Sequence, residues 1–536
     1  MPSTIPQVMQ HAASQFADSV AIAEPSGVSM NYGELHQAAR QVAGALATSG
    51  IEPGDRVAIW SPNTHHWVLA ALGSLYAGAT LVPVNTRYTG PEALDVITRT
   101  KARALFVAGP FLGVDRLQAL RKAADQAALP EPPTALPEPP TALPELIVRI
   151  PVESVESSWD DFIAREASDE LIDARAHAVT PGDVSDILFT SGTTGRSKGA
   201  MSAHRQALDV ARAWAECAEL TSTDRYLIVN PFFHSFGYKA GILACLLTGA
   251  TMVPQLVFDP GASIRLIEAA GITVFPGAPT IYTSILDHPE RPGRDLSSLR
   301  LAVTGAAVVP VALVERMRAE LSFDTVLTAY GLTEAVVATM CRAADDDKTI
   351  ATTSGRAAAD MEIRIVVPEA RQADRATAGH EEQVGEILLR GPNVMLGYLD
   401  DEAATAEAID PDGWLHTGDV GRLDERGYLT ITDRLKDMYI CGGFNVYPAE
   451  VEQALARHPA VAESVVIGVL DERLGEVGKA FVVLRPGAEV SATELIEFSR
   501  ERLANFKVPR QVEFHADLPR NPAGKPLKRL LRGEAN

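Results

Sequence analysis

One short segment combines the residue types that bind phosphate. The run ILFTSGTTGRSKG, residues 187–199, passes from an apolar stretch into glycines, hydroxyl side chains and a lysine. Glycines let backbone amides approach an anion, hydroxyls donate to phosphate oxygens, and the ammonium group adds positive charge. The spacing differs from the GxxxxGKS or GxxxxGKT pattern of the nucleoside-triphosphatase P-loop. The segment predicts a phosphate-binding loop of another kind, with the candidate residues Thr190, Ser191, Gly192, Thr193, Thr194, Gly195 and Lys198.

Two further turns carry a carboxylate close to glycine. In AYGLTEA, residues 329–335, Thr333 and Glu334 place a hydroxyl beside a carboxylate, which suits a phosphate oxygen and its magnesium ion. The same pair could begin a helix, because Thr is a common N-cap. In HTGDVG, residues 416–421, Asp419 is a lone carboxylate that could bind a ligand or close an Asx turn. The residues alone leave both choices open.

A histidine and a lysine depend on their surroundings for a function. His234 lies among aromatic residues in NPFFHSFGYKAG, residues 230–241, where an isolated histidine is usually a core residue. Lys525 lies in NPAGKPLK, residues 521–528, near the end of the chain, where lysines are usually solvated. Local context therefore assigns neither residue a function.

The elements that must position these residues alternate along the first part of the chain. Apolar β-branched segments precede helical segments rich in small residues, as in residues 56–85 and 225–258. Short strands at 272–279 and 299–307 end in glycine-rich turns. This alternation predicts an α/β fold with mixed and mostly parallel sheets. Ligands of such sheets bind at the carboxyl ends of strands, where the glycine-rich turns fall.

The pattern changes after about residue 421. Strand-like segments there flank the helical run PAEVEQALARH, residues 448–458, which predicts a smaller α+β unit. We expect a large N-terminal domain at 1–434 and a small, mobile C-terminal domain at 435–536. The proline-rich repeat at 128–146 favours extended geometry and predicts a surface loop of the large domain.

Composition excludes several classes of protein. Hydrophobic residues make up 46% of the 536 residues, which excludes a largely disordered chain. The 48 basic and 69 acidic side chains give a net charge of −21, which argues against binding to nucleic acid. Four dispersed cysteines form no zinc or disulfide pattern, and no signal peptide is evident, so we expect a cytoplasmic protein. Residues 240–258 are uncharged, but Gly249 and Pro254 interrupt them, which favours a buried helix and strand over a membrane span.

Taken together, the motifs resemble those of the adenylate-forming enzymes: acyl-CoA synthetases, luciferases and the adenylation domains of peptide synthetases. TSGTTGRSKG resembles their phosphate loop, and further motifs follow in order at residues 329–335, 385–399, 413–421, 431–452 and 521–529. The resemblance implies an acid–thiol ligase that uses ATP, Mg²⁺ and coenzyme A. Such an enzyme converts a small-molecule carboxylic acid to its acyl-CoA through an acyl-adenylate.

The resemblance also implies roles for the residues that bear the chemistry. Thr333 would meet the α-phosphate, and Glu334 would hold the metal ion. His234 would lie beside the substrate carboxylate. Lys525 would bridge that carboxylate and the α-phosphate during adenylation. Each role matches the residue type, but only the resemblance assigns it.

Further binding residues follow from the same resemblance. Asp419 and Arg434 would bind the ribose, and Lys436 would be the hinge of the small domain. Gly442 and Gly443 would let the pantetheine arm of coenzyme A pass. The adenine would lie against Gly305, Ala306 and Ala307, and Ala329, Tyr330 and Gly331 would also bind the nucleotide. The acyl pocket would be lined by Phe236, Tyr238, Ala278, Pro279, Ala335 and Val336.

The acid itself is not identified by composition or spacing. The whole chain most resembles acyl-CoA synthetases of actinobacterial steroid catabolism, which implies the indanedione propanoate left after rings A and B are degraded. A medium-chain or aromatic acyl-CoA ligase, a stand-alone enzyme loading a carrier protein, and a non-catalytic nucleotide sensor stay open. A homo-oligomer stays open as well.

Overall fold

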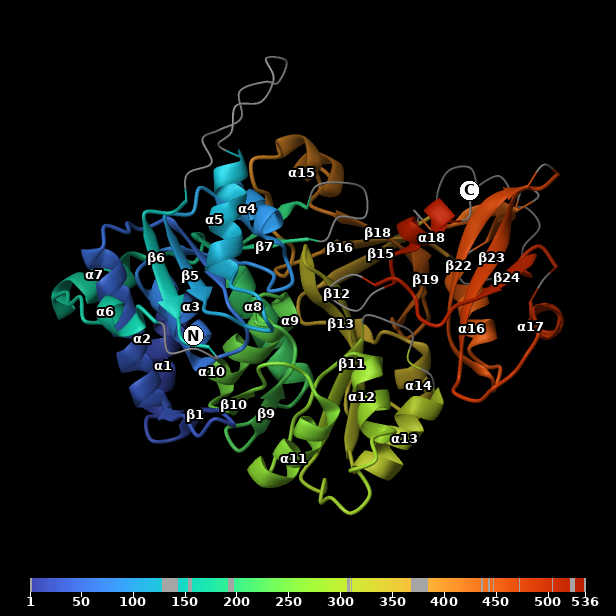
Figure 1. Ribbon diagram of the computed structural model, residues 1–536, viewed down its shortest axis with the longest axis horizontal. Helices are drawn as coiled ribbons and strands as arrows, with labels where there is room; N and C mark the ends of the chain where they lie inside the picture. The colour runs from blue at the N-terminus through green and yellow to red at the C-terminus, as the bar shows by residue number, and fades with distance from the viewer. Residues whose placement is uncertain are drawn as a thin grey trace. The chain divides into compact units, whose positions relative to one another are not determined.

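The computed structural model divides the chain into two compact units (Figure 1). The first is Met1–Glu362 with Arg390–Gly413, and the second is Ile363–Leu389 with Trp414–Asn536. The structure describes residues 2–127, 143–152, 157–190, 197–305, 309, 311–367, 384–434, 437–441, 444–446, 448–471, 473–503, 505–520 and 526–534.

A seven-stranded sheet lies in the first unit. Its strands, in spatial order, are β17 (Gly397–Tyr398), β8 (Gly199–Ala203), β7 (Val184–Phe189), β4 (Thr80–Pro83), β3 (Arg56–Trp60), β5 (Ala104–Ala108) and β6 (Leu146–Ile150). The pairs from β7 to β6 are parallel, whereas β8 runs antiparallel to β7 and to β17. Apolar residues of α4 (Gly90–Arg99) and α5 (Arg116–Ala127) pack on the core strands. Residues 128–142 of the predicted proline-rich loop, 128–146, lie outside the described part of the chain, and its last residue, Leu146, is already the first residue of β6.

The other strands of this unit form a second layer. One part has the order β2 (Ser29–Asn31), β1 (Val20–Ala23), β10 (Thr251–Pro254), β9 (Arg225–Ile228). The other has the order β11 (Leu301–Gly305), β12 (Thr325–Leu332), β13 (Ala335–Met340), β14 (Arg356–Ala357). Val274 joins the two parts through parallel bridges to Tyr226 and Leu301.

Helices surround both sheets of the first unit. They are α1 (Ile5–Gln15), α2 (Tyr32–Thr48), α3 (His65–Tyr76), α6 (Trp159–Ile163), α7 (Asp169–Ala178), α8 (His204–Cys217), α9 (Ser235–Gly237), α10 (Ala244–Thr248), α11 (Pro260–Ala270), α12 (Pro279–Leu286), α13 (Val311–Leu321), α14 (Asp347–Thr352) and α15 (Glu402–Ala408). Helix starts follow capping chemistry: Asn31 and Glu34 form a reciprocal capping box at α2.

The uncharged segment 240–258 folds as predicted. A π-helix, Tyr238–Leu243, continues into α10, and Gly249 ends that helix with a φ of 77°. Strand β10 follows, and all its residues are buried. Left-handed backbone favours glycine, so Gly249 explains the sharp stop. Within the described ranges, no helix has the length and apolar character needed to cross a membrane.

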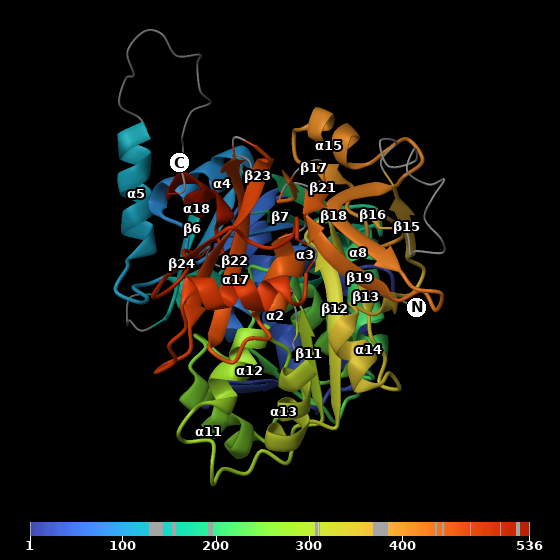
Figure 2. The same cartoon turned by 90° about the vertical axis from the view of Figure 1, so that its right-hand side faces the viewer.

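The second unit contains two sheets (Figure 2). One sheet has the order β15 (Glu362–Val366), β16 (Gly385–Arg390), β18 (Leu415–Leu423), β19 (Leu429–Arg434). The other has the order β21 (Phe444–Val446), β20 (Tyr439–Cys441), β23 (Gly475–Leu484), β22 (Val461–Asp471), with β24 (Gln511–Phe514) parallel to β23. Helices α16 (Pro448–Leu455), α17 (Ala492–Arg500) and α18 (Lys528–Glu534) contribute to its apolar core.

The predicted fold class, α/β with a smaller α+β unit, is confirmed. The compact units divide the chain earlier than residue 434, because β18 and β19 share a sheet with β15 and β16. The domain boundary at 434, defined by a hinge at Lys436, stays a prediction, since residues 435 and 436 lie outside the described ranges.

Candidate active site

Four predicted site segments follow neighbouring parallel strands. β9, the bridging residue Val274, β11 and β12 run parallel to one another. His234, Ala278 and Glu334 follow β9, Val274 and β12, and Gly305 is the last residue of β11. Parallel strands present their carboxyl ends at one edge of a sheet, where ligands bind. The sheet therefore gathers residues that are up to a hundred positions apart in the sequence.

The predicted phosphate loop closes a β-hairpin formed by β7 and β8. The Thr190 amide donates to the Lys198 carbonyl at 2.9 Å, which joins the two ends of the loop. Arg99 of α4 supports the returning end, because its guanidinium donates to the Ser197 carbonyl at 2.6 Å. Thr190 and Lys198 are half-buried. The predicted loop residues between them, Ser191, Gly192, Thr193, Thr194 and Gly195, lie outside the described residues.

Tyr398 connects the predicted metal carboxylate with the lysine of the phosphate loop. Its hydroxyl donates to Glu334 Oε1 at 2.8 Å, and the Lys198 ammonium lies 4.9 Å from its ring centroid. Pairing of β17 with β8 brings Tyr398 there. Burial, and secondly the Glu334 carboxylate, raise the pKa of Tyr398, so the phenol stays protonated and donates. Sequence reasoning missed Tyr398, because its position in the 385–399 motif does not reveal this contact.

Thr333 and Glu334 form the turn between β12 and β13. The alternative that they begin a helix is wrong, because both flanking segments are strands. A Cβ on Gly331 would lie 2.6 Å from the Val337 amide nitrogen. Only glycine therefore fits at that position of the hairpin. The turn leaves both Thr333 and Glu334 half-buried.

Small residues are required where β11 meets β12. Gly305 and Ala329 are register partners at the end of the parallel pair. A Cβ on Gly305 would lie 2.4 Å from the Ala329 carbonyl oxygen, so a larger residue would separate the strands. Gly305, Ala329 and Tyr330 are half-buried, which is compatible with the predicted adenine site. Ala306 and Ala307 lie outside the described residues.

His234 lies at the start of helix α9. Its Nδ1 accepts from the Phe236 amide at 3.2 Å, which makes the ring the cap of that helix. Solvent reaches the side chain, but surrounding protein desolvates it and lowers the pKa of His234, which favours the neutral form. A neutral ring that accepts at Nδ1 carries its proton on Nε2. His234 can therefore donate Nε2–H to a carboxylate oxygen.

Asn63 fixes the irregular segment that carries His234, and sequence reasoning missed it. Its side-chain amide donates to the carbonyls of Ile228 at 3.3 Å and Asn230 at 3.0 Å. Its Oδ1 accepts from the Phe232 amide at 2.8 Å. Asn63 is buried, and its side chain hydrogen-bonds the backbone of Asn230 and Phe232, which follow β9, and the carbonyl of Ile228, the last residue of β9. An asparagine at the end of an apolar strand segment was the available signal.

The predicted acyl-pocket residues differ in exposure. Ala335 and Val336 are buried, whereas Phe236, Ala278 and Pro279 are half-buried. Tyr238 is fully buried, with its ring 6.2 Å from that of Trp67. The structure thus places Tyr238 within the core, and its contact with substrate stays a prediction.

In the second unit, Asp419 and Arg434 are cross-strand partners on β18 and β19. Asp419 is 6% exposed, and its amide donates to Thr417 Oγ1 at 3.1 Å. The two residues predicted to bind the ribose therefore lie opposite each other on neighbouring strands of one sheet. The predicted residues Lys436, Gly442, Gly443 and Lys525 lie outside the described residues.

The donor set in the first unit fits a magnesium ion shared with phosphate. Glu334 offers a carboxylate oriented by Tyr398, and Thr333 offers a hydroxyl. Mg²⁺ usually takes one or two carboxylates together with substrate phosphates. No cluster of three or more His, Cys, Asp or Glu side chains occurs in the part of the chain that the structure describes. When bound, the ion would neutralise phosphate charge.

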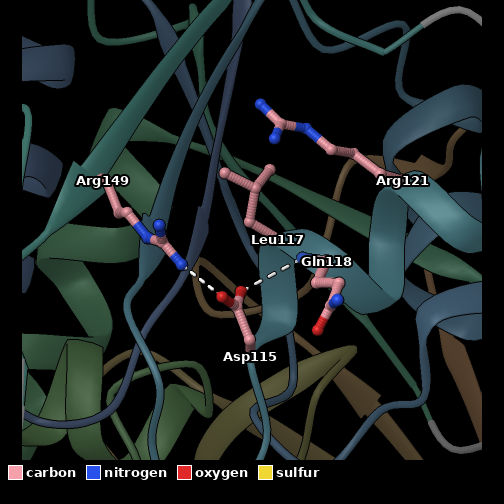
Figure 3. Close-up of a pocket in the computed structure, with 5 residues that line it drawn as sticks. All are labelled: Asp115, Leu117, Gln118, Arg121 and Arg149. Carbon is pink, nitrogen blue, oxygen red and sulfur yellow. Dashed lines mark hydrogen bonds and ion pairs between the residues drawn. The ribbon is translucent and has the colours of Figure 1, made fainter. Parts of the chain in front are cut away.

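A shallow hollow of about 260 Å³ lies between α5 and the edge strand β6, away from these residues (Figure 3). Arg121 and Arg149 line it, but Arg149 forms an ion pair with Asp115. In the sheet order, β5, β3 and β4 separate β6 from the phosphate-loop strand β7. The hollow is therefore no part of the candidate site.

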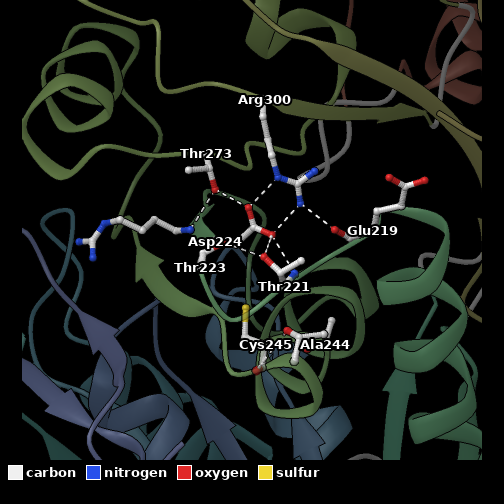
Figure 4. Close-up of polar contacts among 10 residues, drawn as sticks. Glu219, Thr221, Thr223, Asp224, Ala244, Cys245, Thr273 and Arg300 are labelled. Carbon is white, nitrogen blue, oxygen red and sulfur yellow. Dashed lines mark hydrogen bonds and ion pairs between the residues drawn. The ribbon is translucent and has the colours of Figure 1, made fainter.

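Asp224 joins strands at the end of the sheet opposite the site (Figure 4). Its Oδ1 accepts from Arg300 Nε and Thr273 Oγ1, both at 2.7 Å, and its Oδ2 accepts from the Thr221 amide at 2.8 Å. Asp224, Thr273 and Arg300 directly precede β9, Val274 and β11. One carboxylate therefore holds the amino ends of three strands whose carboxyl ends carry the predicted site.

These features define an adenylate-forming enzyme. The chain belongs to the AMP-binding enzyme family, which it matches over residues 9–399. It also matches the AMP-binding enzyme C-terminal domain over residues 450–525.

Two similar ligases match the chain over nearly its full length. It is 58% identical to the 3-[(3aS,4S,7aS)-7a-methyl-1,5-dioxo-octahydro-1H-inden-4-yl]propanoyl:CoA ligase of Rhodococcus jostii, over 99% of both chains. It is also 58% identical to the ligase of the same name from Mycobacterium tuberculosis, over 99% of this chain and 98% of the relative. The crystal structure of ATP-bound MatB from Rhodopseudomonas palustris matches with a TM-score of 0.84 and 29% identity, over 100% and 99% of the two chains.

These findings confirm the expected family and chemistry. The protein is an ATP- and Mg²⁺-dependent acyl-CoA ligase that works through an acyl-adenylate. The roles assigned to single residues stay predictions, because no bound ligand tests them.

Proposed function

We propose that this enzyme forms the coenzyme A thioester of a steroid-derived ring propanoate, the indanedione propanoate. The observation that carries this proposal is 58% identity, over nearly the full length, to two ligases named for that acid. Four free and buried cysteines, and the use of ATP and coenzyme A, support a cytoplasmic location.

The first chemical problem is that a carboxylate is a poor electrophile. It must approach the polyanionic triphosphate before it can be activated, so positive charge has to be gathered around both anions. We assign this task to Lys198, to the amides of the phosphate loop and to Lys525. His234 donates Nε2–H to the acid, and Thr333 donates its hydroxyl to the α-phosphate. Glu334, which accepts a hydrogen bond from Tyr398, would hold the magnesium ion.

The second step is attack by the coenzyme A thiol on the acyl-adenylate. The small domain would present Lys525 for the first step and Gly442 and Gly443 for the second, by turning about Lys436. Asp419 and Arg434 would bind the ribose through both steps. Their cross-strand pairing supports this assignment, since it makes the two residues neighbours in the backbone register of one sheet.

A panel of acids tests the proposed substrate. Pyrophosphate release would be measured with ATP, Mg²⁺ and coenzyme A, with fatty, aryl and steroid-derived ring propanoates as acids, and product masses checked. We expect the highest kcat/KM for the indanedione propanoate, with its acyl-CoA as product. Preference for a fatty or aryl acid would overturn the substrate and keep the ligase chemistry. Transfer to a carrier protein but not to coenzyme A would overturn the ligase assignment.

A further inference from the structure

A fully buried ion pair joins the π-helix Tyr238–Leu243 to strand β7. The ammonium of Lys239 is 2.9 Å from Asp186 Oδ1, and the two side chains are 1% and 0% exposed. Lys239 also donates to Ser202 Oγ at 2.8 Å. The Ser185 hydroxyl donates to Asp186 Oδ2 at 2.7 Å. Each charged group is thus paired and hydrogen-bonded away from water.

Stability alone does not account for this pair. Removing two charges from water costs free energy that their attraction often fails to repay. Replacing such a pair with apolar side chains of similar size is often neutral or stabilising. The pair therefore calls for a role that an apolar core contact would not fulfil.

The pair joins the stem of the phosphate loop to a separate element. Asp186 and Ser202 are register partners on β7 and β8. Asp186 lies four residues before Thr190, and Ser202 lies four residues after Lys198, so both stand at the same height on the hairpin. Lys239 holds both strands at once from outside the hairpin.

Lys239 in turn belongs to the segment that carries the predicted acid contacts. It lies in the π-helix Tyr238–Leu243, a rare element that occurs mostly at functional sites. The Tyr238 amide donates to the His234 carbonyl at 3.0 Å, so this helix continues directly from the His234 turn. A Cβ on Gly237 would lie 2.3 Å from the Pro231 carbonyl oxygen, which shows how tightly the segment folds back.

We propose that Lys239, Asp186 and Ser202 form a positioning unit that sets the distance between the acid-binding segment, residues 230–238, and the phosphate loop. This inference rests on the proposed function. In adenylation, a carboxylate oxygen forms a bond to the α-phosphorus while the bond from that phosphorus to the pyrophosphate oxygen breaks. Pyrophosphate leaves with the electron pair of that bond. A displacement of about 1 Å between two reactants can cost about a hundredfold in rate, so a rigid tie between their binding segments matters.

The test is a double variant, Lys239→Met with Asp186→Leu, which replaces the pair by apolar side chains and leaves no lone charge buried. ATP–pyrophosphate exchange would be measured with an acid that the wild type accepts. We expect kcat of exchange to fall by about tenfold to a hundredfold. The dissociation constant for ATP without acid should change less than about threefold, because the phosphate loop itself is kept. A purely structural role would not separate these two quantities.

The matched control is Asp224→Leu with Arg300→Met, which removes the ion pair at the opposite ends of the strands. This control should lower Tm and leave kcat of exchange near the wild-type value. Ser202→Ala is a milder variant that keeps the ion pair. It should lower kcat of exchange by about threefold and leave the dissociation constant for ATP near the wild-type value, even though loss of a buried hydrogen bond also lowers Tm, and it decides the question if the double variant does not fold.

Wild-type exchange in the folded double variant would overturn the inference, as would equal losses of exchange and ATP binding. Wild-type exchange in Ser202→Ala would overturn it when the double variant is unfolded. An error in the proposed substrate would be a separate result, because the wild-type enzyme would then prefer another acid in the substrate panel.

Discussion

At the scale of single residues, Tyr398 has the contact that most directly supports the proposed metal site. Its phenol donates to Glu334 at 2.8 Å, which leaves the second carboxylate oxygen to face a metal ion. Removing a partner that orients a metal ligand typically costs about tenfold to a hundredfold in metal affinity or activity. We expect Tyr398→Phe to raise the Mg²⁺ concentration for half-maximal pyrophosphate release by about tenfold, measured at saturating ATP and acid.

A second buried tyrosine provides the control for this prediction. Tyr32 donates to the carbonyls of Cys245 and Ala250 at 2.8 and 2.6 Å, so Tyr32→Phe also removes a buried phenol hydrogen bond. It should lower Tm and leave the Mg²⁺ dependence unchanged. The same Mg²⁺ dependence in Tyr398→Phe as in the wild type would contradict an orienting role for Tyr398.

At the scale of elements, Asp224 ties strands together in a way that depends on pH. Burial would raise the pKa of Asp224, but hydrogen bonds from Arg300, Thr221 and Thr273 lower it below the ordinary value. A lowered pKa in the folded state gives stability that is present above the unfolded pKa, near 3.9, and lost as the pH falls through the folded value. We expect Arg300→Met to cost about 2 kcal/mol near neutral pH, the size of a hydrogen bond to a charged group.

The dependence of Tm on pH tests this prediction. The difference in Tm between wild type and Arg300→Met should stay constant from pH 7 to pH 5 and shrink below about pH 4. Thermal unfolding followed by circular dichroism would measure it. A difference that grows with acidity would mean that Asp224 is not ionised in the folded protein.

Much of the element arrangement could be predicted from the sequence. The sequence predicts strands at 272–279 and 299–307: the structure has β11 in the second segment and a parallel bridge at Val274 in the first, and both run parallel at one sheet edge. Tyr398 and Lys239 could not be found in that way, because their partners, Glu334 in a turn and Asp186 on a strand, are distant in sequence. The Thr333–Glu334 pair was compatible with both a helix start and a hairpin, and only pairing of β12 with β13 decides between them.

At the scale of the whole molecule, the proposed mechanism requires one small domain to serve two half-reactions. The catalytic step assigned to Lys525 belongs to adenylation, whereas thioester formation needs the glycine pair Gly442 and Gly443. The two tasks use different residues of one domain, so they predict that a single substitution can separate them.

Lys525→Ala should therefore slow adenylation by about 10²–10³, the size of one lost transition-state donor. Thioester formation from acyl-adenylate prepared in advance should stay near the wild-type rate, because that step has no use for the bridging ammonium. Lys528→Ala is the matched control, since the Lys528 ammonium pairs with Glu452 at 3.1 Å and both half-reactions should survive its loss. Single-turnover measurements of each half-reaction decide the matter. Equal slowing of both steps by Lys525→Ala would argue against two working orientations and would place Lys525 in a shared binding role instead.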